Sequence, residues 1–138
     1  MALYPYLFFS GTCRAAFTRY QEIFGGDLEL MTMADIPSEE AVPAQAGLIM
    51  HAALTFDGHL LMASDDPTGD GGPMRGVSVN YTLAEATDAT RVFEALAEGG
   101  EITMPLAETF WAPLFGMCVD RFGVPWMVNV EGRGDHKG

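Results

Sequence analysis

Two stretches of the chain decide the fold: LYPYLFFSGTCRAAFTRYQEIFGG at residues 3–26 and VSVNYTLAEATDATRVFEALAEGG at residues 77–100. Each begins with a short segment typical of a strand, continues with apolar residues at helical spacing, and ends in Gly-Gly. In residues 77–83 apolar side chains alternate with polar ones, which predicts a strand with one buried and one polar face. The order strand, helix, Gly-Gly therefore occurs twice, which predicts a duplicated architecture.

The segments that follow each Gly-Gly also correspond. After the first come residues 28–33 and 51–56, a turn at Asp57-Gly58, and residues 60–63; an Asp-Gly pair between strands is a strong hairpin signal. After the second come residues 101–104, 115–119 and 124–130, with a turn near Phe122-Gly123. Each half is therefore predicted to be β-α-β-β-β, an α+β fold.

We expect one domain, residues 1–138, built from two modules. Its predicted parts are a first βαβββ module (1–65), a linker (66–75), a second βαβββ module (76–131) and a polar tail (132–138). A small sheet with one helix cannot bury itself alone. Two such halves, each with its helix outside, can form a half-open barrel around a shared cleft, which is the expected ligand site.

Composition narrows the function classes. Seven Lys and Arg against 19 Asp and Glu give a net charge of −12, which disfavours nucleic acid and anionic membrane surfaces as partners. The longest apolar run, Leu3 to Phe9, is too short to span a bilayer and lacks signal-peptide flanks, so we expect a cytoplasmic protein. Cys13 and Cys118 are too few for a disulfide framework. Most of the nine methionines are expected to fill the core.

The residues also resemble a known superfamily. The matching segments are Pro5–Phe9, Gly11, Tyr20, Phe24–Gly26, Met50–Ala52, Leu61–Asp65, Glu108–Ala112, Phe115-Gly116 and Asp120–Asn129. They resemble the PhnB-like group of the vicinal oxygen chelate superfamily, which includes glyoxalase I, bleomycin resistance proteins and extradiol dioxygenases. The resemblance implies paired βαβββ modules, a half-open barrel and a homodimer. Sequences of this group sometimes carry a demethylubiquinone methyltransferase label, but no strand here is followed by a glycine-rich loop that would hold a nucleotide-like cofactor.

The resemblance also implies where a metal ion would bind. Metal-dependent members of the superfamily take His and Glu ligands from the first and fourth strands of each module. The corresponding positions lie near Pro5, Met62, Ser78 and Met127, and their neighbours include no imidazole or carboxylate. Thioether, hydroxyl and amide groups do not make a tight Zn, Ni or Fe(II) site. We therefore expect no metal in that position and no cofactor.

Five residues are candidates for ligand binding. His51 is the best candidate for a catalytic base because its strand carries apolar residues on the opposite face, although a structural histidine fits the same pattern. Ser78 and Asn80 lie on the polar face of the strand at 77–83, which faces either water or a wet pocket. Trp111, beside Glu108 in a loop, is a candidate for stacking on a ligand, or for a dimer interface.

Other polar residues are better explained structurally. Asp65 ends a strand and is expected to cap the following segment, while Asp120 lies beside a tight turn. The sequence Ser10-Gly11-Thr12 offers caps for the first helix. Cys13, in the first turn of that helix, is a candidate for a lowered thiol pKa. His59 is expected to be exposed, and His136 lies in the tail.

Three hypotheses about function remain open. The first is a metal-independent protein that binds a small molecule, which needs only a dimer with suitable pockets. The second is an enzyme of the same superfamily, of lyase, isomerase or dioxygenase type, acting through His51 or through a metal in a non-standard site. The third is a non-catalytic partner protein that uses its aromatic cluster only to dimerise.

Overall fold

The computed structural model describes residues 2–32, 47–66 and 73–131. The chain divides into two compact units, Met1–Gly72 and Pro73–Gly138, and each is described by itself. The predicted linker falls largely on residues outside the described ranges, and residues 33–46 lie outside them as well. The predicted tail, with His136, lies outside them entirely.

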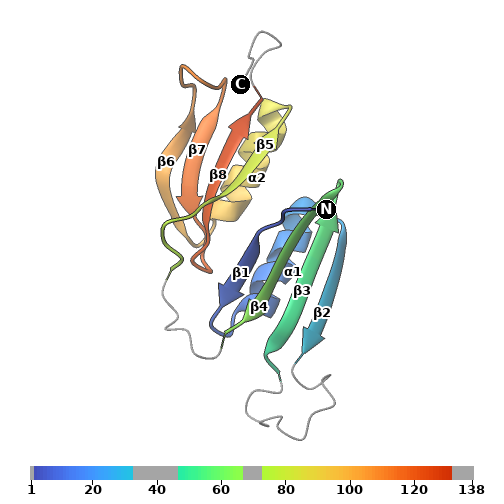
Figure 1. Cartoon of the computed structure of the whole chain (residues 1–138). Coiled ribbons are helices and arrows are strands. Elements are labelled where there is room, and N and C mark those ends of the chain that lie inside the picture. The colour runs from blue at the N-terminus through green and yellow to red at the C-terminus, as the bar shows by residue number, and fades with distance from the viewer. Residues whose placement is uncertain (1, 33–46, 67–72, 132–138) are drawn as a thin grey trace, which may run out of the picture. The chain divides into compact units, whose positions relative to one another are not determined.

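The first unit is a four-stranded sheet with one helix. Its elements are β1 (Tyr6–Phe9), α1 (Cys13–Phe24), β2 (Asp27–Thr32), β3 (Ile49–Phe56) and β4 (His59–Asp65). The strand order is β1-β4-β3-β2, with β1 parallel to β4 and the other pairs antiparallel. Figure 1 shows α1 covering one face of this sheet.

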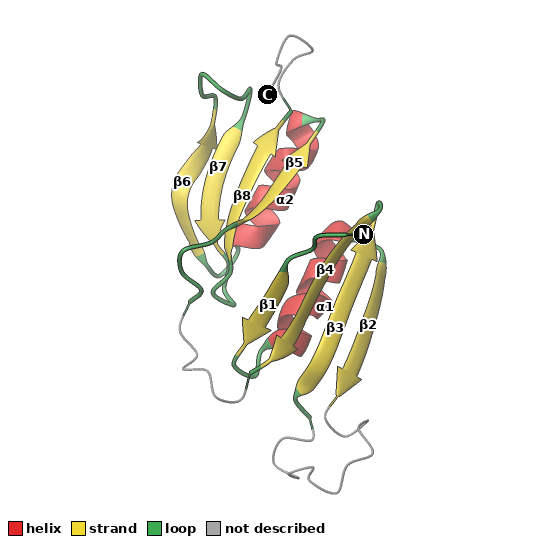
Figure 2. Cartoon of the chain, viewed as in Figure 1, coloured by secondary structure: helices red, strands yellow, loops and turns green. Residues whose placement is uncertain are grey.

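The second unit repeats this arrangement. Its elements are β5 (Val79–Leu83), α2 (Ala86–Ala97), β6 (Glu101–Ala107), β7 (Phe115–Val119) and β8 (Pro125–Val130). The strand order is β5-β8-β7-β6, again with one parallel pair, β5 with β8, and with the helix on one face of the sheet (Figure 2). The predicted α+β fold with two βαβββ modules is confirmed.

Each core lies between a helix and one face of its sheet. In the first unit Phe17 and Tyr20 of α1 are fully buried and pack edge to face, with ring centroids 5.4 Å apart. In the second unit Val92 and Phe93 of α2 face β7 and β8. A Cβ added to Gly116 would lie 2.9 Å from the Phe93 ring, so a glycine in β7 lets the helix approach the sheet.

The helix α1 is capped from another strand. Thr12, one of the predicted residues 10–12, is the N-cap residue, but its side chain makes no capping hydrogen bond. The Asp65 carboxylate at the end of β4 instead accepts hydrogen bonds from the backbone N–H groups of Gly11 (2.9 Å) and Cys13 (3.0 Å). A third bond comes from Ile49 N (2.8 Å). A negative charge at a helix N-terminus is stabilising, and here it also joins three distant segments.

Asp120 holds the β7–β8 turn in a similar way. Its carboxylate is buried and accepts hydrogen bonds from the backbone N–H groups of Phe122 and Val124 and from Trp126 Nε1, each at 2.9 Å. Asp120 and Trp126 therefore have structural roles, as the sequence indicated for Asp120.

The methionines are not where the sequence analysis expected them. Seven of them lie in the described ranges, and none belongs to the buried core. They are Met31, Met50, Met62, Met74, Met104, Met117 and Met127. The prediction that most methionines fill the core is therefore wrong for these seven, because apolar character alone does not tell which face of a sheet a side chain covers.

Candidate functional site

Each sheet has one face that its own helix does not cover. In the first unit this face, called here the first helix-free face, carries residues that alternate with buried ones along the central and edge strands. They are Tyr6 and Phe8 of β1, His51 and Ala53 of β3, and Met62 of β4. It is unusually apolar for a surface, since Phe8 is 60% exposed and Tyr6 is 39% exposed.

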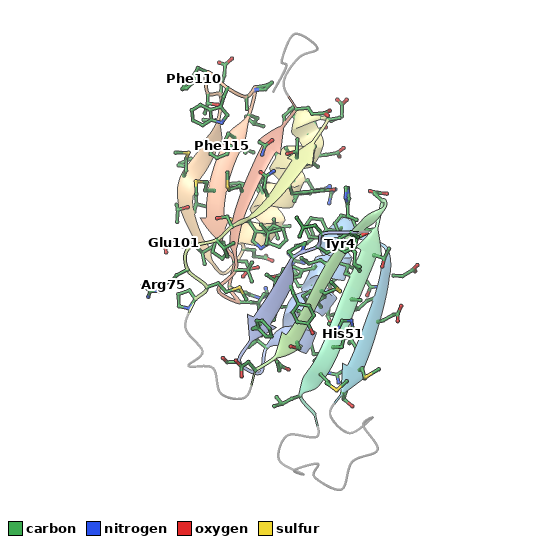
Figure 3. The ribbon with its side chains drawn as sticks, viewed as in Figure 1. Tyr4, His51, Arg75, Glu101, Phe110 and Phe115 are labelled. Carbon is green, nitrogen blue, oxygen red and sulfur yellow. The ribbon has the colours of Figure 1, made fainter. Side chains whose placement is uncertain are left out.

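Tyr6 and His51 form a polar pair on this face. The Tyr6 hydroxyl lies 3.2 Å from His51 Nδ1, and the two rings are 5.8 Å apart between centroids. Figure 3 shows His51 on the side of the sheet turned away from α1. If the hydroxyl donates to Nδ1, the imidazole proton lies on Nε2, which is then a donor to whatever binds there. The sequence pattern identified His51 but not Tyr6, whose place on this face depends on the pairing of β1 with β4.

The face of the second sheet that α2 does not cover is called here the second helix-free face. On it, three polar side chains of β5 and β8 form a cluster. Asn129 Nδ2 donates to Asn80 Oδ1 at 2.7 Å, and the Thr82 hydroxyl donates to Asn129 Oδ1 at 3.0 Å. Asn80 Nδ2 closes the cycle by donating to the Thr82 hydroxyl oxygen at 3.2 Å. We call these residues the amide cycle. It includes the predicted Asn80, whereas Asn129 was not among the predicted ligand-binding residues.

A row of methionines continues from the amide cycle across the same sheet. Met104 of β6 lies opposite Met117 of β7, Met117 lies opposite Met127 of β8, and Met127 lies beside Asn80. Residues directly opposite one another in a sheet share a face, so the three thioether side chains form one strip, called here the methionine row. Thioether side chains are flexible and polarisable, and they adapt to ligands of varied shape.

The β6–β7 loop contains two more sequence candidates, Trp111 and Glu108. Trp111 is 45% exposed and makes edge-to-face contacts with Phe110 (4.7 Å) and Phe115 (5.4 Å). Phe110 is 96% exposed, and Figure 3 places it at one end of the second sheet. Glu108 is exposed, with no hydrogen bond to a described residue. The loop thus presents an aromatic surface next to an acidic side chain.

The remaining sequence candidates take different places. Ser78 precedes β5, is half-buried, and has no hydrogen bond to the amide cycle among the described residues. His59 is exposed, as expected, and packs against the Phe56 ring. Cys13 is fully buried, and this burial together with the nearby Asp65 raises its thiol pKa to about 12. The suggestion of a lowered pKa is therefore wrong, because desolvation outweighs the helix dipole.

The positions where the superfamily resemblance implies a metal do not suit one. On the helix-free faces the first and fourth strands of each unit place Tyr6 opposite Met62 and Asn80 opposite Met127. Phenol, thioether and amide groups are poor ligands for Zn, Ni or Fe(II). Across residues 2–32, 47–66 and 73–131, no three His, Cys, Asp or Glu side chains gather as a metal site would require. These residues therefore do not fit the metal of the metal-dependent members.

Two βαβββ units, each with an open sheet face, define a glyoxalase/bleomycin resistance-like fold. A protein of that group from Nocardioides has this fold, with a TM-score of 0.63 at 18% identity, covering 100% of this chain and 87% of that one. The chain belongs to the family described as 3-demethylubiquinone-9 3-methyltransferase, whose family model matches residues 1–129. The PhnB-like membership predicted from the residues is thus confirmed.

Three relatives illustrate the family. The chain is 44% identical to PA1353 of Pseudomonas aeruginosa, over 95% of this chain and 98% of PA1353, with a TM-score of 0.85. It is 25% identical to a PhnB protein from Bacillus cereus, over 95% and 100% of the two chains, with a TM-score of 0.77. It is 34% identical to the protein YjdN of Escherichia coli K12, over 94% of this chain and 95% of YjdN. These similarities establish the family and the fold.

Within the described ranges, neither helix has the length and apolar character needed to cross a bilayer.

Proposed function

We propose that this chain is a metal-independent small-molecule-binding protein of the glyoxalase/bleomycin resistance superfamily, and that its ligand lies against the second helix-free face. The observation that carries the proposal is the amide cycle next to the methionine row. A few oriented polar groups beside an adaptable apolar surface are what a small-molecule site requires. Binding of this kind needs no metal and no catalytic group.

The charge of the ligand is not set by the charge of the whole protein. The net charge is −12, yet the amide cycle and the methionine row contain no charged side chain. The acidic surface therefore gives no reason to expect a cationic ligand at this face. We expect the ligand to be held by apolar contact and by hydrogen bonds to amide groups.

A second candidate function, an enzyme acting on a small metabolite, is favoured by one observation. The Tyr6 hydroxyl lies 3.2 Å from His51 Nδ1. A half-buried imidazole with a phenol partner is a reasonable general acid or base. His51 would then be the catalytic residue and Tyr6 would orient its ring. Under the binding hypothesis the same pair is only a polar contact on the first helix-free face.

We propose further that the protein is a cytoplasmic homodimer. The exposed Phe110 and half-exposed Trp111 support an association surface, because large aromatic side chains are enriched at interfaces. Light scattering after size exclusion is expected to give twice the chain mass of 14.9 kDa, and a lower mass for Trp111→Ala if the loop forms the interface. A monomeric wild-type protein would contradict the dimer.

The binding hypothesis is tested by a thermal-shift screen of metabolites and antibiotics, done with and without a chelator. A ligand that binds the native state raises the apparent stability. We expect hits that persist in chelator, that weaken in Asn80→Ala, and that are unchanged in His51→Ala. Stoichiometric Zn, Ni, Mn or Fe in the purified protein, with binding lost in chelator, would refute it. Turnover of a hit that disappears in His51→Ala would favour the enzyme.

A further inference from the structure

The amide cycle has a property that selects among ligands. Each asparagine side chain has two N–H groups and one oxygen with two lone pairs. In the cycle one N–H of Asn80 and one N–H of Asn129 are used, and the Thr82 hydroxyl both donates and accepts. If all three bonds ran in the opposite sense, the same number of groups would be used. In either sense each amide keeps one N–H that has no partner among the described residues.

When a ligand covers this face, these two N–H groups determine which ligands can bind. Each amide oxygen already accepts one hydrogen bond, and a carbonyl with a spare lone pair is tolerated when buried. A buried N–H without a partner is much less tolerated, because it loses its water and gains nothing. A ligand that displaces water from the amide cycle therefore has to bring an acceptor to these donors. An apolar ligand without one would leave both unsatisfied.

The surroundings of the cycle decide the charge of that acceptor. On this face Met127 lies beside Asn80 and Phe115 lies opposite Asn129, with Met117 next to Met127, and all three are apolar. Neither the amide cycle nor the methionine row includes Lys or Arg. Burying a carboxylate or phosphate here would cost its hydration with no cation to compensate. A neutral carbonyl-type oxygen loses much less on leaving water. The apolar part of such a ligand would lie on the methionine row.

We infer that the second helix-free face binds apolar molecules that carry a neutral carbonyl-type oxygen, with the free N–H groups of Asn80 and Asn129 as its donors and the body of the ligand on the methionine row. The inference rests on the proposed function and adds the chemical class of its ligand. Thr82 is a positioning residue, because its hydroxyl fixes the orientation of both amides without donating to the ligand.

The test uses three probes with the same naphthalene ring. Acetylnaphthalene has a neutral carbonyl, ethylnaphthalene has no acceptor, and naphthoate has an anionic one. We expect acetylnaphthalene to bind the full-length protein about tenfold more tightly than either of the others, which corresponds to two ordinary neutral hydrogen bonds. The side-chain amide NMR signals of Asn80 and Asn129 are expected to shift with acetylnaphthalene alone.

Variants separate the donors from the residue that orients them. Asn129→Leu is expected to reduce the tenfold preference to about twofold or less, because one donor and the cycle are both lost. Thr82→Val keeps both donors, so it is expected to weaken the preference only in part and to broaden the amide signals. Thr55→Val, an exposed threonine on β3 of the first unit, is the matched control and is expected to change nothing.

The outcomes distinguish this inference from the proposed function. Equal affinity for acetylnaphthalene and ethylnaphthalene, or unmoved amide signals of Asn80 and Asn129, would overturn the inference and leave a binding protein of another specificity. Tighter binding of naphthoate would overturn it as well. Failure of all three probes, together with an empty thermal-shift screen, would overturn the proposed function too. The wild-type comparison needs no variant, so a misfolded Asn129→Leu would not prevent a decision.

Discussion

Replacing Asp65 with asparagine tests the most connected polar group of the first unit. Asp65 is 5% exposed and accepts hydrogen bonds from the backbone N–H groups of Gly11, Cys13 and Ile49. Asparagine has nearly the same shape and keeps one acceptor oxygen, which can still take the two bonds at the start of α1. Its NH₂ group, however, then faces the N–H of Ile49, so that donor is left unsatisfied.

The size of the effect follows from these contacts. Losing one hydrogen bond to a charged group costs about 1.5–3 kcal/mol. Removing the negative charge at the N-terminus of α1 adds about 0.3–1 kcal/mol. We therefore expect Asp65→Asn to lower the free energy of unfolding by about 2–4 kcal/mol, and Asp65→Ala to lower it further because all three bonds are lost.

Urea unfolding of the two units can be followed separately. Both tryptophans, Trp111 and Trp126, lie in the second unit, so their fluorescence reports on that unit. Hydrogen exchange of the Ile49 amide reports on the first unit at the site of the change. Asp57→Asn removes the same charge at the exposed β3–β4 turn and is expected to change stability by less than about 0.5 kcal/mol. If Asp65→Asn is no more destabilising than this control, the carboxylate does not hold these segments together.

Three further predictions concern a thiol, a tryptophan and a glycine. The pKa of Cys13 is raised to about 12, so it binds its proton in the native state at pH values where the unfolded thiol has lost it. Cys13 is therefore expected to lower stability by about 1.4 kcal/mol per pH unit between pH 9 and 12. In pH-dependent urea titrations Cys13→Ala removes this contribution, whereas that of Cys118, whose pKa burial raises to about 11, remains. Trp126→Phe loses the hydrogen bond from Nε1 to the buried Asp120 carboxylate. It is expected to lower the free energy of unfolding by about 2 kcal/mol, measured by a method that does not use tryptophan fluorescence. Gly26→Ala would place a Cβ 2.1 Å from the Thr55 carbonyl oxygen at a φ of +89°, and is expected to cost at least about 2 kcal/mol by calorimetry.

Each of these has a matched comparison. Trp111→Phe, in the exposed loop, is expected to leave stability nearly unchanged, so equal effects at both tryptophans would contradict the role given to Asp120. Gly25→Ala has the positive φ without the close contact, so it is expected to cost less than Gly26→Ala. Rapid reaction of native Cys13 with a thiol reagent at pH 8 would be inconsistent with its raised pKa.

The sequence predicted what depends on local periodicity. The alternation of Val79, Tyr81 and Leu83 with Asn80 and Thr82 predicted the two faces of β5, because strand side chains alternate with a period of two. Helical spacing predicted α1 and α2 in the same way. The duplication was predicted because the same order of strand, helix and Gly-Gly occurs in both halves of the chain.

The candidate site was less predictable because it depends on pairs far apart in the chain. Tyr6 and His51 are separated by 45 positions, and Asn80 and Asn129 by 49. Tyr6 of β1 lies near His51 of β3, and Asn80 of β5 lies near Asn129 of β8, only because of how the strands pair in each sheet. The register of that pairing is not a local property of any one strand segment. The cap that Asp65 supplies to α1 has the same origin, with 54 positions between Asp65 and Gly11.

The placement of the methionines has a consequence for oxidative damage. Oxidation converts a thioether into a polar sulfoxide, which in a buried core disrupts packing. Here the seven described methionines lie outside the core, so peroxide would alter the surfaces proposed to bind ligand while the packing of each helix on its sheet stays intact. Loss of ligand affinity would then come before any loss of folded structure, and a sulfoxide reductase could restore the affinity without refolding the chain.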